Sequence, residues 1–120
     1  MRPLIILLCL LVSVSSATGA NEKMQSEIDY LLKYVEATKG QFIRSGKEYS
    51  GKEAAAHLRS KLSKAGDRIK STEDFVNGIA SKSYLTGSVY KIKLPDGSIQ
   101  PSGPWLMKAL AERRRVATPQ

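Results

Sequence analysis

The chain has little of the chemistry on which catalytic and disulfide-stabilised domains rely. Its 120 residues include one cysteine, Cys9, and one histidine, His57. Cys9 lies inside an apolar N-terminal run, and loss of that run as a leader would leave no disulfide, reactive thiol or thiolate metal site. A catalytic metal site usually needs three protein ligands, of which one histidine supplies a single one. We therefore expect no metal and no cofactor.

Common catalytic patterns are also missing. Four serines considered as nucleophiles lie neither in an elbow motif nor in an S-x-x-K spacing: Ser60, Ser63, Ser81 and Ser83. No glycine-rich phosphate loop is present, and the acidic residues show no glycosidase-like pairing. No aromatic side chain interleaves with the basic run at 59–70, so binding to single-stranded nucleic acid is not expected. These absences favour a non-enzymatic protein that does not bind nucleic acid.

The first twenty residues have the features of a secretory signal peptide. Arg2 supplies a positive flank, Leu4 to Val12 is apolar, and residues 13–20 are small and weakly polar. The apolar run is too short to span a membrane, which takes about 20 residues. We expect cleavage after Ala20, with a cut after Ala17 as the second choice. The mature chain would then be periplasmic and would carry no transmembrane segment.

Basic side chains outnumber acidic ones. Nineteen Lys and Arg face eleven Asp and Glu, a net charge of +8. Loss of Arg2 with the leader lowers the net charge to +7. Outside the cytoplasm, such a protein meets anionic lipid headgroups, cell-wall polymers and acidic proteins. We expect an envelope protein or an anionic cell-wall or lipid component as partner; the alternative is that the charge only maintains solubility.

Hydrophobic periodicity predicts one domain over residues 21–112. Apolar residues at helical spacing indicate helices over 21–39, from 51 to about 64, and from 71 to about 80. The inward stripe of the first helix is Met24, Ile28, Leu31, Leu32 and Val35. Ser50 and Glu53 form a capping box at the start of the second helix, and Ser71 caps the third. Residues 41–44 are predicted to be a brief strand or a buried connector, and Ser45-Gly46 to turn the chain.

The period then changes from helical to two. Tyr90, Ile92 and Leu94 alternate with lysines, and a Pro-Asp-Gly turn follows at 95–97, which predicts a return strand at 98–100. Pro104 opens a fourth helix. The predicted fold is therefore α+β, with three helices, a two-stranded antiparallel hairpin and a C-terminal helix around one small core. Residues 113–120 are predicted to be a basic flexible tail.

Two polar residues lie four apart on the second predicted helix. Glu53 and His57 therefore share a flank, where they could bind a metal or act as an acid–base pair. However, His57 lies roughly 100° from the centre of the apolar face, and Glu53 already serves the capping box. We therefore favour a structural histidine that bonds to a backbone carbonyl or to Glu53. For the basic run that includes Arg59 and Lys61, a solvated face is the default. The alternative is clustering with Arg44 and Lys47 to bind an anionic partner.

Several short segments resemble those of a known family. They are Phe42-Ile43-Arg44-Ser45-Gly46, residues 53–61 (EAAAHLRSK), Glu73-Asp74-Phe75-Val76, residues 79–83 (IASKS) and residues 86–90 (TGSVY). Together they are similar to the small exported bacterial proteins of the YfeK-like type, domain-of-unknown-function family 5329. The resemblance spans about residues 27–110 and implies a periplasmic location in a Gram-negative bacterium, without an activity.

The resemblance also suggests which positions to examine. Relatives carry a cysteine where this chain has Gly40 and another near Leu94, a pair that would join the 42–44 segment to the hairpin; without them we expect residues 40–46 to be more mobile here. Relatives have Asn in place of Ser45 and Ser in place of Tyr84. The candidate binding residues are Arg44, Glu53, His57, Arg59, Lys61, Ser81, Ser83 and Tyr90. Five of them could form one shared polar cluster: Arg44, Glu53, His57, Ser81 and Ser83. For this cluster a satisfied polar network is favoured, and a binding site is the alternative.

Three functional hypotheses remain. The first is a periplasmic, non-enzymatic interaction domain of the cell envelope. The second is an inhibitor or immunity-type protein that blocks a cell-wall-degrading enzyme, because residues 34–40 and 86–90 are similar to short signatures of periplasmic lysozyme inhibitors, although in reversed order. The third is a small metal-dependent or hydrolytic enzyme built around Glu53 and His57.

Overall fold

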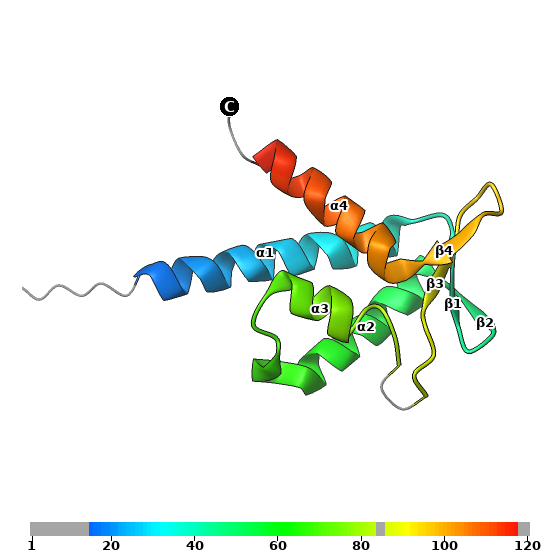
Figure 1. The fold of residues 1–120 in the computed structure, drawn as a ribbon, viewed down its shortest axis with the longest axis horizontal. Helices are drawn as coiled ribbons and strands as arrows, with labels where there is room; N and C mark the ends of the chain where they lie inside the picture. Colours follow the sequence, from blue (N-terminus) through cyan, green and yellow to red (C-terminus); the bar gives the residue numbers. More distant parts are fainter. Residues whose placement is uncertain (1–14, 84–85, 118–120) are drawn as a thin grey trace, which may run out of the picture.

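The computed structural model describes residues 15–83 and 86–117. The elements follow in the order α1 (Ser15–Ala37), β1 (Gln41–Arg44), β2 (Lys47–Ser50), α2 (Gly51–Ala65), a 3-10 turn (Gly66–Arg68), α3 (Thr72–Gly78), β3 (Lys91–Lys93), β4 (Ile99–Pro101) and α4 (Ser102–Ala117). The sheet lies at one end of the helices (Figure 1). Most of the expected leader, Tyr84 and the last three residues of the expected tail lie outside the described residues. No helix in the described ranges has the length and apolar character needed to cross a membrane.

Helix α1 supplies the largest apolar stripe of the core. Of its predicted inward residues, Met24 is partly buried against the core, and four are fully buried: Ile28, Leu31, Leu32 and Val35. The helix begins at Ser15, upstream of the predicted start at residue 21, and it ends at Ala37, two residues before the predicted end. The residues that contact the core all lie beyond the predicted cleavage point.

The sheet has four antiparallel strands in the order β2-β1-β3-β4, so the prediction of a two-stranded hairpin was wrong. Residues 41–44 form β1, which pairs with strands on both sides: Phe42 lies opposite Tyr49 of β2 and opposite Ile92 of β3. The segment expected to be mobile therefore includes an inner strand of the sheet. Hydrogen bonding to both neighbours fixes it without any cysteine.

A two-residue turn joins β1 to β2. Ser45 and Gly46 have φ of 50° and 81°, the positive values that a type I′ hairpin turn requires. Such a turn matches the twist of antiparallel strands, so β2 returns directly beside β1. The predicted turn at this place is confirmed, but the strand that follows it was not predicted.

Helix α2 starts directly after β2 and folds back against α1. The predicted capping box is confirmed: the Glu53 amide donates to Ser50 Oγ at 3.1 Å, and the Ser50 amide donates to Glu53 Oε1 at 2.9 Å. A Cβ atom on Gly51 would overlap the carbonyl oxygen of Val35. Glycine is therefore required where the start of α2 meets the end of α1.

The C-terminal half of the chain completes the fold. Ser71 caps α3, as predicted, because its side chain accepts from the Asp74 amide at 3.0 Å. Helix α4 continues to Ala117, five residues into the segment expected to be a flexible tail. Arg114 explains this extension, since it binds Glu27 of α1 at 2.8 Å and Glu73 of α3 at 2.7 Å.

One hydrophobic core joins the helices to the sheet. Its largest fully buried apolar side chains come from four different elements, α1, α3, β3 and α4: Ile28, Leu31, Val35, Phe75, Val76, Ile92, Leu106 and Leu110. This core confirms the α+β class predicted from the sequence.

Candidate functional site

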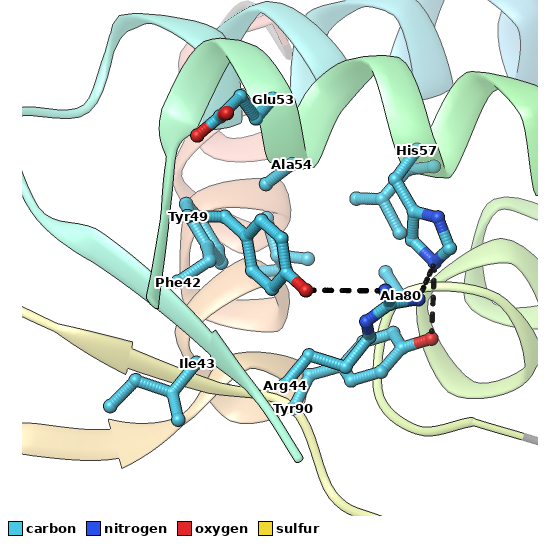
Figure 2. Close-up of a pocket in the computed structure, with 11 residues that line it drawn as sticks. Phe42, Ile43, Arg44, Tyr49, Glu53, Ala54, His57, Ala80 and Tyr90 are labelled. Carbon is cyan, nitrogen blue, oxygen red and sulfur yellow. Dashed lines mark hydrogen bonds between the residues drawn. The ribbon is translucent and has the colours of Figure 1, made fainter. Parts of the chain in front are cut away.

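A pocket of about 220 Å³ lies between α2 and the β1–β2 hairpin. Eight of its eleven lining residues come from this one stretch of chain, and three come from more distant segments (Figure 2). The lining residues are Phe42, Ile43, Arg44, Tyr49, Glu53, Ala54, His57, Leu58, Ala80, Tyr90 and Leu106. The pocket therefore has mostly apolar walls with a few polar groups, as small-molecule sites commonly do.

The alternation of side chains along β1 and β2 puts the polar groups of the hairpin on the side of the sheet that faces the pocket. Side chains two apart in a strand share a face, so Arg44 points to the same side of the sheet as Phe42. Tyr49 joins them because it lies opposite Phe42 in the β1–β2 register. On α2, Ala54 and His57 are three residues apart and line the same pocket. The arginine, the tyrosine and the histidine are thus brought together by ordinary strand and helix periodicity.

Arg44 is the centre of a small hydrogen-bonded cluster. Its Nη1 donates to His57 Nε2 at 3.1 Å, and its Nη2 lies 3.4 Å from the Tyr49 hydroxyl, to which it donates. The Tyr90 hydroxyl lies 3.5 Å from the same Nε2 atom of His57, as the dashed lines in Figure 2 show. Because Nε2 accepts from Arg44, we assign the ring proton of neutral His57 to Nδ1.

Lys61 supports this cluster from behind Tyr90. Its ammonium group donates to the Tyr90 hydroxyl at 2.9 Å and to the backbone carbonyls of Ile79 and Lys82 at 2.7 and 3.1 Å. Three acceptors match the three protons of an ammonium group. Since the Tyr90 oxygen accepts from Lys61, the proton of this hydroxyl is free to point toward His57 and the pocket.

The electrostatic environment of the pocket is positive. Burial lowers the pKa of His57 below its usual 6.5, and the charges of Arg44, Lys61 and Lys64 lower this pKa further. Across the described ranges, neither Arg44 nor Lys61 forms an ion pair with a carboxylate. Glu53 is exposed and lines the pocket, but its Oε1 atom already accepts from the Ser50 amide. Arg44 and Lys61, both half-buried, therefore bring cationic charge to the site without a carboxylate partner among residues 15–83 and 86–117.

The sequence-based candidates separate into two groups. Arg44, His57, Lys61 and Tyr90 come together in the cluster, and Glu53 lies beside it at the pocket wall. Arg59 points elsewhere and pairs with Glu36 at 3.3 Å. Ser81 donates to the Val76 carbonyl at 2.6 Å, and the Ser83 backbone holds the loop through the Ser88 carbonyl at 2.9 Å. These last three residues have local structural roles.

The partners of His57 differ from those favoured by the sequence. We expected a bond to a backbone carbonyl or to Glu53, but the ring bonds to the side chains of Arg44 and Tyr90. The reason is that β1 lies beside α2, an arrangement that the spacing within α2 alone does not reveal. Of the basic run, Lys61 reaches the cluster through the Tyr90 hydroxyl, whereas Arg68 bonds to the carbonyls at the end of α2.

Sequence reasoning missed Tyr49 and, with it, strand β2. The four residues of β2 include one apolar side chain and no alternating pattern, so hydrophobic periodicity gives no strand signal. A signal was nevertheless present in the flanking residues. Between a two-residue turn at 45–46 and a helix cap at Ser50, the chain is just long enough for one short strand that returns beside β1. Tyr49 of that strand would then lie opposite a residue of β1.

The chemistry of the cluster suits binding. Within the described ranges, no group of three or more potential metal ligands comes together. His57 uses Nε2 to accept from a guanidinium, and a nitrogen engaged in that way is a poor general base. By contrast, a guanidinium beside two phenol hydroxyls in a mostly apolar pocket is well suited to hold an anionic group.

Comparison with known proteins identifies the family of this chain. Residues 22–114 match the family described as "Family of unknown function (DUF5329)". The chain is 32% identical over 82 residues to "Uncharacterized protein YfeK" of Salmonella typhimurium (strain LT2), an alignment that covers 68% of each protein. No solved structure matches the chain.

Proposed function

Because the chain belongs to this family of unknown function, we propose its role from the pocket: a non-enzymatic binding domain of the cell envelope that holds an anionic group. The anionic group is bound at Arg44, between α2 and the β1–β2 hairpin. It belongs to a component of the envelope, as the basic character of the chain favours.

A single observation carries this proposal: Arg44 lies in a half-buried pocket without a carboxylate partner among the described residues. Removing a cation from water costs free energy unless an anion pairs with it, and neutral hydrogen-bond acceptors offset this desolvation cost only in part. Its present acceptors are the neutral groups His57 and Tyr49. An anion that displaced water and approached the guanidinium would complete the pairing.

The location in the envelope rests on the sequence. The charged, apolar and small-residue order of residues 1–20 supports export through a cleaved signal peptide. Cleavage after Ala20 leaves every residue of the pocket in the mature chain. The binding proposal therefore concerns the mature protein in the periplasm.

The non-enzymatic part of the proposal rests on the roles already taken by the reactive side chains. His57 is an acceptor for Arg44, and the hydroxyl of Ser81 is committed to the Val76 carbonyl. The inhibitor hypothesis finds less support. Tyr34 lies within α1 and Tyr90 is buried, so the two inhibitor-like signatures do not share an exposed loop.

The test is a titration of the ¹⁵N-labelled protein with three anions: phosphate, acetate and phenylacetate. We expect at least one of them to shift amide resonances of residues around Arg44 and His57, with saturation. The Arg44→Gln variant should lose these shifts. Arg59→Gln is the matched control, because it removes an arginine whose partner is the exposed Glu36 and should bind like the unaltered protein. Absence of saturable shifts at the pocket with all three anions would refute the proposal.

A further inference from the structure

We infer that the ligand of this pocket is a small monocarboxylate with a compact apolar body, of the arylalkanoate type. Its carboxylate lies against Arg44 and the Tyr90 hydroxyl, and its apolar body lies among Phe42, Leu58 and Leu106. This inference rests on the proposed function, because it names the class of anion that the same site takes.

The volume of the pocket supports an apolar body of limited size. An apolar cavity of about 150 Å³ can hold a benzene molecule. The pocket here measures about 220 Å³, so it has room for one aromatic ring with a short acidic arm. Its walls include Phe42, Leu58 and Leu106, which are buried. A simple inorganic anion would leave most of this apolar surface without contact.

The geometry at Arg44 supports a planar carboxylate. Both terminal nitrogens of the guanidinium face groups in the pocket, with contacts of 3.1 Å to His57 and 3.4 Å to Tyr49. A carboxylate pairs with two such N–H groups in a bidentate manner. The contact to Tyr49 is long for a hydrogen bond, so its loss to a ligand oxygen costs little.

The neighbouring hydroxyl supplies a further donor. The oxygen of Tyr90 accepts from Lys61 at 2.9 Å, so its proton is not needed for that contact. The nearest acceptor for this proton is His57 Nε2, at a distance of 3.5 Å. A ligand oxygen closer to the hydroxyl would make a stronger hydrogen bond than this ring nitrogen does. Lys61 is thus a positioning residue that fixes the direction of the Tyr90 donor.

The charge of the pocket favours one negative charge over two. The ammonium group of Lys61 already has three acceptors and lies behind Tyr90, which leaves Arg44 as the cation on the pocket wall among the described residues. Desolvation of a dianion costs more than that of a monoanion. One guanidinium in an apolar pocket is therefore matched to one carboxylate.

The experiment compares four probes by calorimetry and by ¹⁵N shift titration of the purified protein. The probes are phenylacetate, acetate, phosphate and the neutral analogue phenylethanol. We expect phenylacetate to bind about tenfold or more tightly than each of the others, because the alternatives lack either the ring or the charge. Arg44→Gln should lower the affinity for phenylacetate about tenfold and leave that for phenylethanol unchanged.

A second variant tests the apolar part without altering the charge. Ala54→Leu fills part of the pocket and should weaken phenylacetate binding about fivefold or more, while acetate and phosphate are unaffected. Ala56→Leu makes the same change at an exposed position of α2 and serves as the control. Helix propensity is similar for alanine and leucine, so both variants should fold.

The outcomes separate this inference from the proposed function. If acetate or phosphate binds at Arg44 as tightly as phenylacetate, the inference is overturned and the proposed anion site stands. Equal affinities for phenylethanol and phenylacetate would also overturn the inference, since the carboxylate would then contribute nothing. If no probe produces saturable shifts at the pocket, both proposals fail.

Discussion

The guanidinium of Arg44 donates a hydrogen bond to Nε2 of His57 across 3.1 Å, which holds a permanent cation against a titratable base. The two residues belong to β1 and α2, so the contact also joins the walls of the pocket. Protonation of His57 would remove the acceptor and place two cations side by side. The pair therefore couples the protonation of the ring to the geometry of the site.

His57 should titrate below its usual pKa of 6.5, because burial and the charges of Arg44, Lys61 and Lys64 disfavour the imidazolium. The Arg44→Gln variant should move the His57 pKa upward, toward 6.5, whereas Arg59→Gln should leave it unchanged. The measurement is a proton NMR titration of the imidazole ring between pH 4 and 8. A His57 pKa at or above 6.5 in the unaltered protein would contradict the environment described.

The same group should make folding stability depend on pH. Since the folded-state pKa of His57 is lowered, the unfolded chain binds the proton more readily as pH falls through 6.5. The free energy of unfolding should therefore decrease below pH 6.5 until the folded-state pKa is reached. His57→Gln should remove this part of the dependence. Denaturant unfolding at pH 7.5 and pH 5.5 measures this change in the free energy of unfolding. If the free energy falls equally between these pH values in both proteins, His57 is not its cause.

Glu27 should be the acidic residue with the greatest importance for stability. Its hydrogen bonds to Arg114, helped by Thr72, lower its pKa from 4.5 to about 2 although burial acts in the opposite direction. Glu27→Gln should reduce the free energy of unfolding by about 2 kcal/mol at pH 7, because it removes the charge of a buried carboxylate that accepts two hydrogen bonds from Arg114. The matched control is Glu112→Gln, which removes an exposed partner of Arg115 and should leave the free energy of unfolding almost unchanged, because solvent screens this pair.

The Glu27 contribution also has a defined pH range. Because the folded-state pKa is lowered, the stabilisation is present above about pH 4.5 and is lost as pH falls toward 2. Glu27→Gln should therefore show a weaker loss of stability in acid than the unaltered protein. Chemical denaturation at pH 7, 4 and 3 tests this, and parallel acid profiles for the two proteins would count against the Glu27–Arg114 pairing as the cause.

Ser45→Asn should stabilise the β1–β2 hairpin. Ser45 has a φ of 50° and precedes Gly46, so the replacement creates the Asn-Gly pair that type I′ turns favour. We expect an increase of about 0.5 kcal/mol in the free energy of unfolding. Gly46→Ala is the opposite test: its φ of 81° disfavours any side chain, and stability should fall by about 1 kcal/mol. Thermal and denaturant unfolding of the three proteins would detect both changes, and a loss on Ser45→Asn would refute the turn assignment.

Export should produce a mature chain that begins at Asn21. Intact-mass measurement and N-terminal sequencing of the protein from a periplasmic extract test this prediction. Ala20→Arg should block the cut, since the cleavage site requires a small residue. Recovery of the uncut, unaltered protein from the cytosol would remove the basis for an envelope partner.

The helices of this fold were predictable because each carries its own signal. The stripe Ile28, Leu31, Leu32 and Val35 repeats at helical spacing, and the caps at Ser50 and Ser71 mark where the next two helices begin. These signals are local, so one sequence suffices to detect them. The end of α4 was not predictable in this way, because its last turn depends on the contact of Arg114 with Glu27 of a distant helix.

The sheet and the site were predictable only in part. The sequence identified Arg44 and Tyr90 through the segments that resemble the family. It identified His57 through its spacing from Glu53, and Lys61 through the basic run. It did not reveal that Arg44 faces His57, because β1 pairs with β3 over about fifty residues of chain. Long-range pairing of short strands leaves little trace in local periodicity. Tyr49 remained hidden for the same reason.

The length of the turn at Ser45 and Gly46 determines which way Tyr49 points. One inserted residue would shift the register of β2 by a single position, while β1 would stay held by its pairing with β3. Alternation would then send the Tyr49 hydroxyl to the outer face of the sheet, so Arg44 would keep its place and lose one of its two side-chain acceptors. The surroundings of this guanidinium can therefore change through loop length alone, without any substitution among the residues that line the pocket.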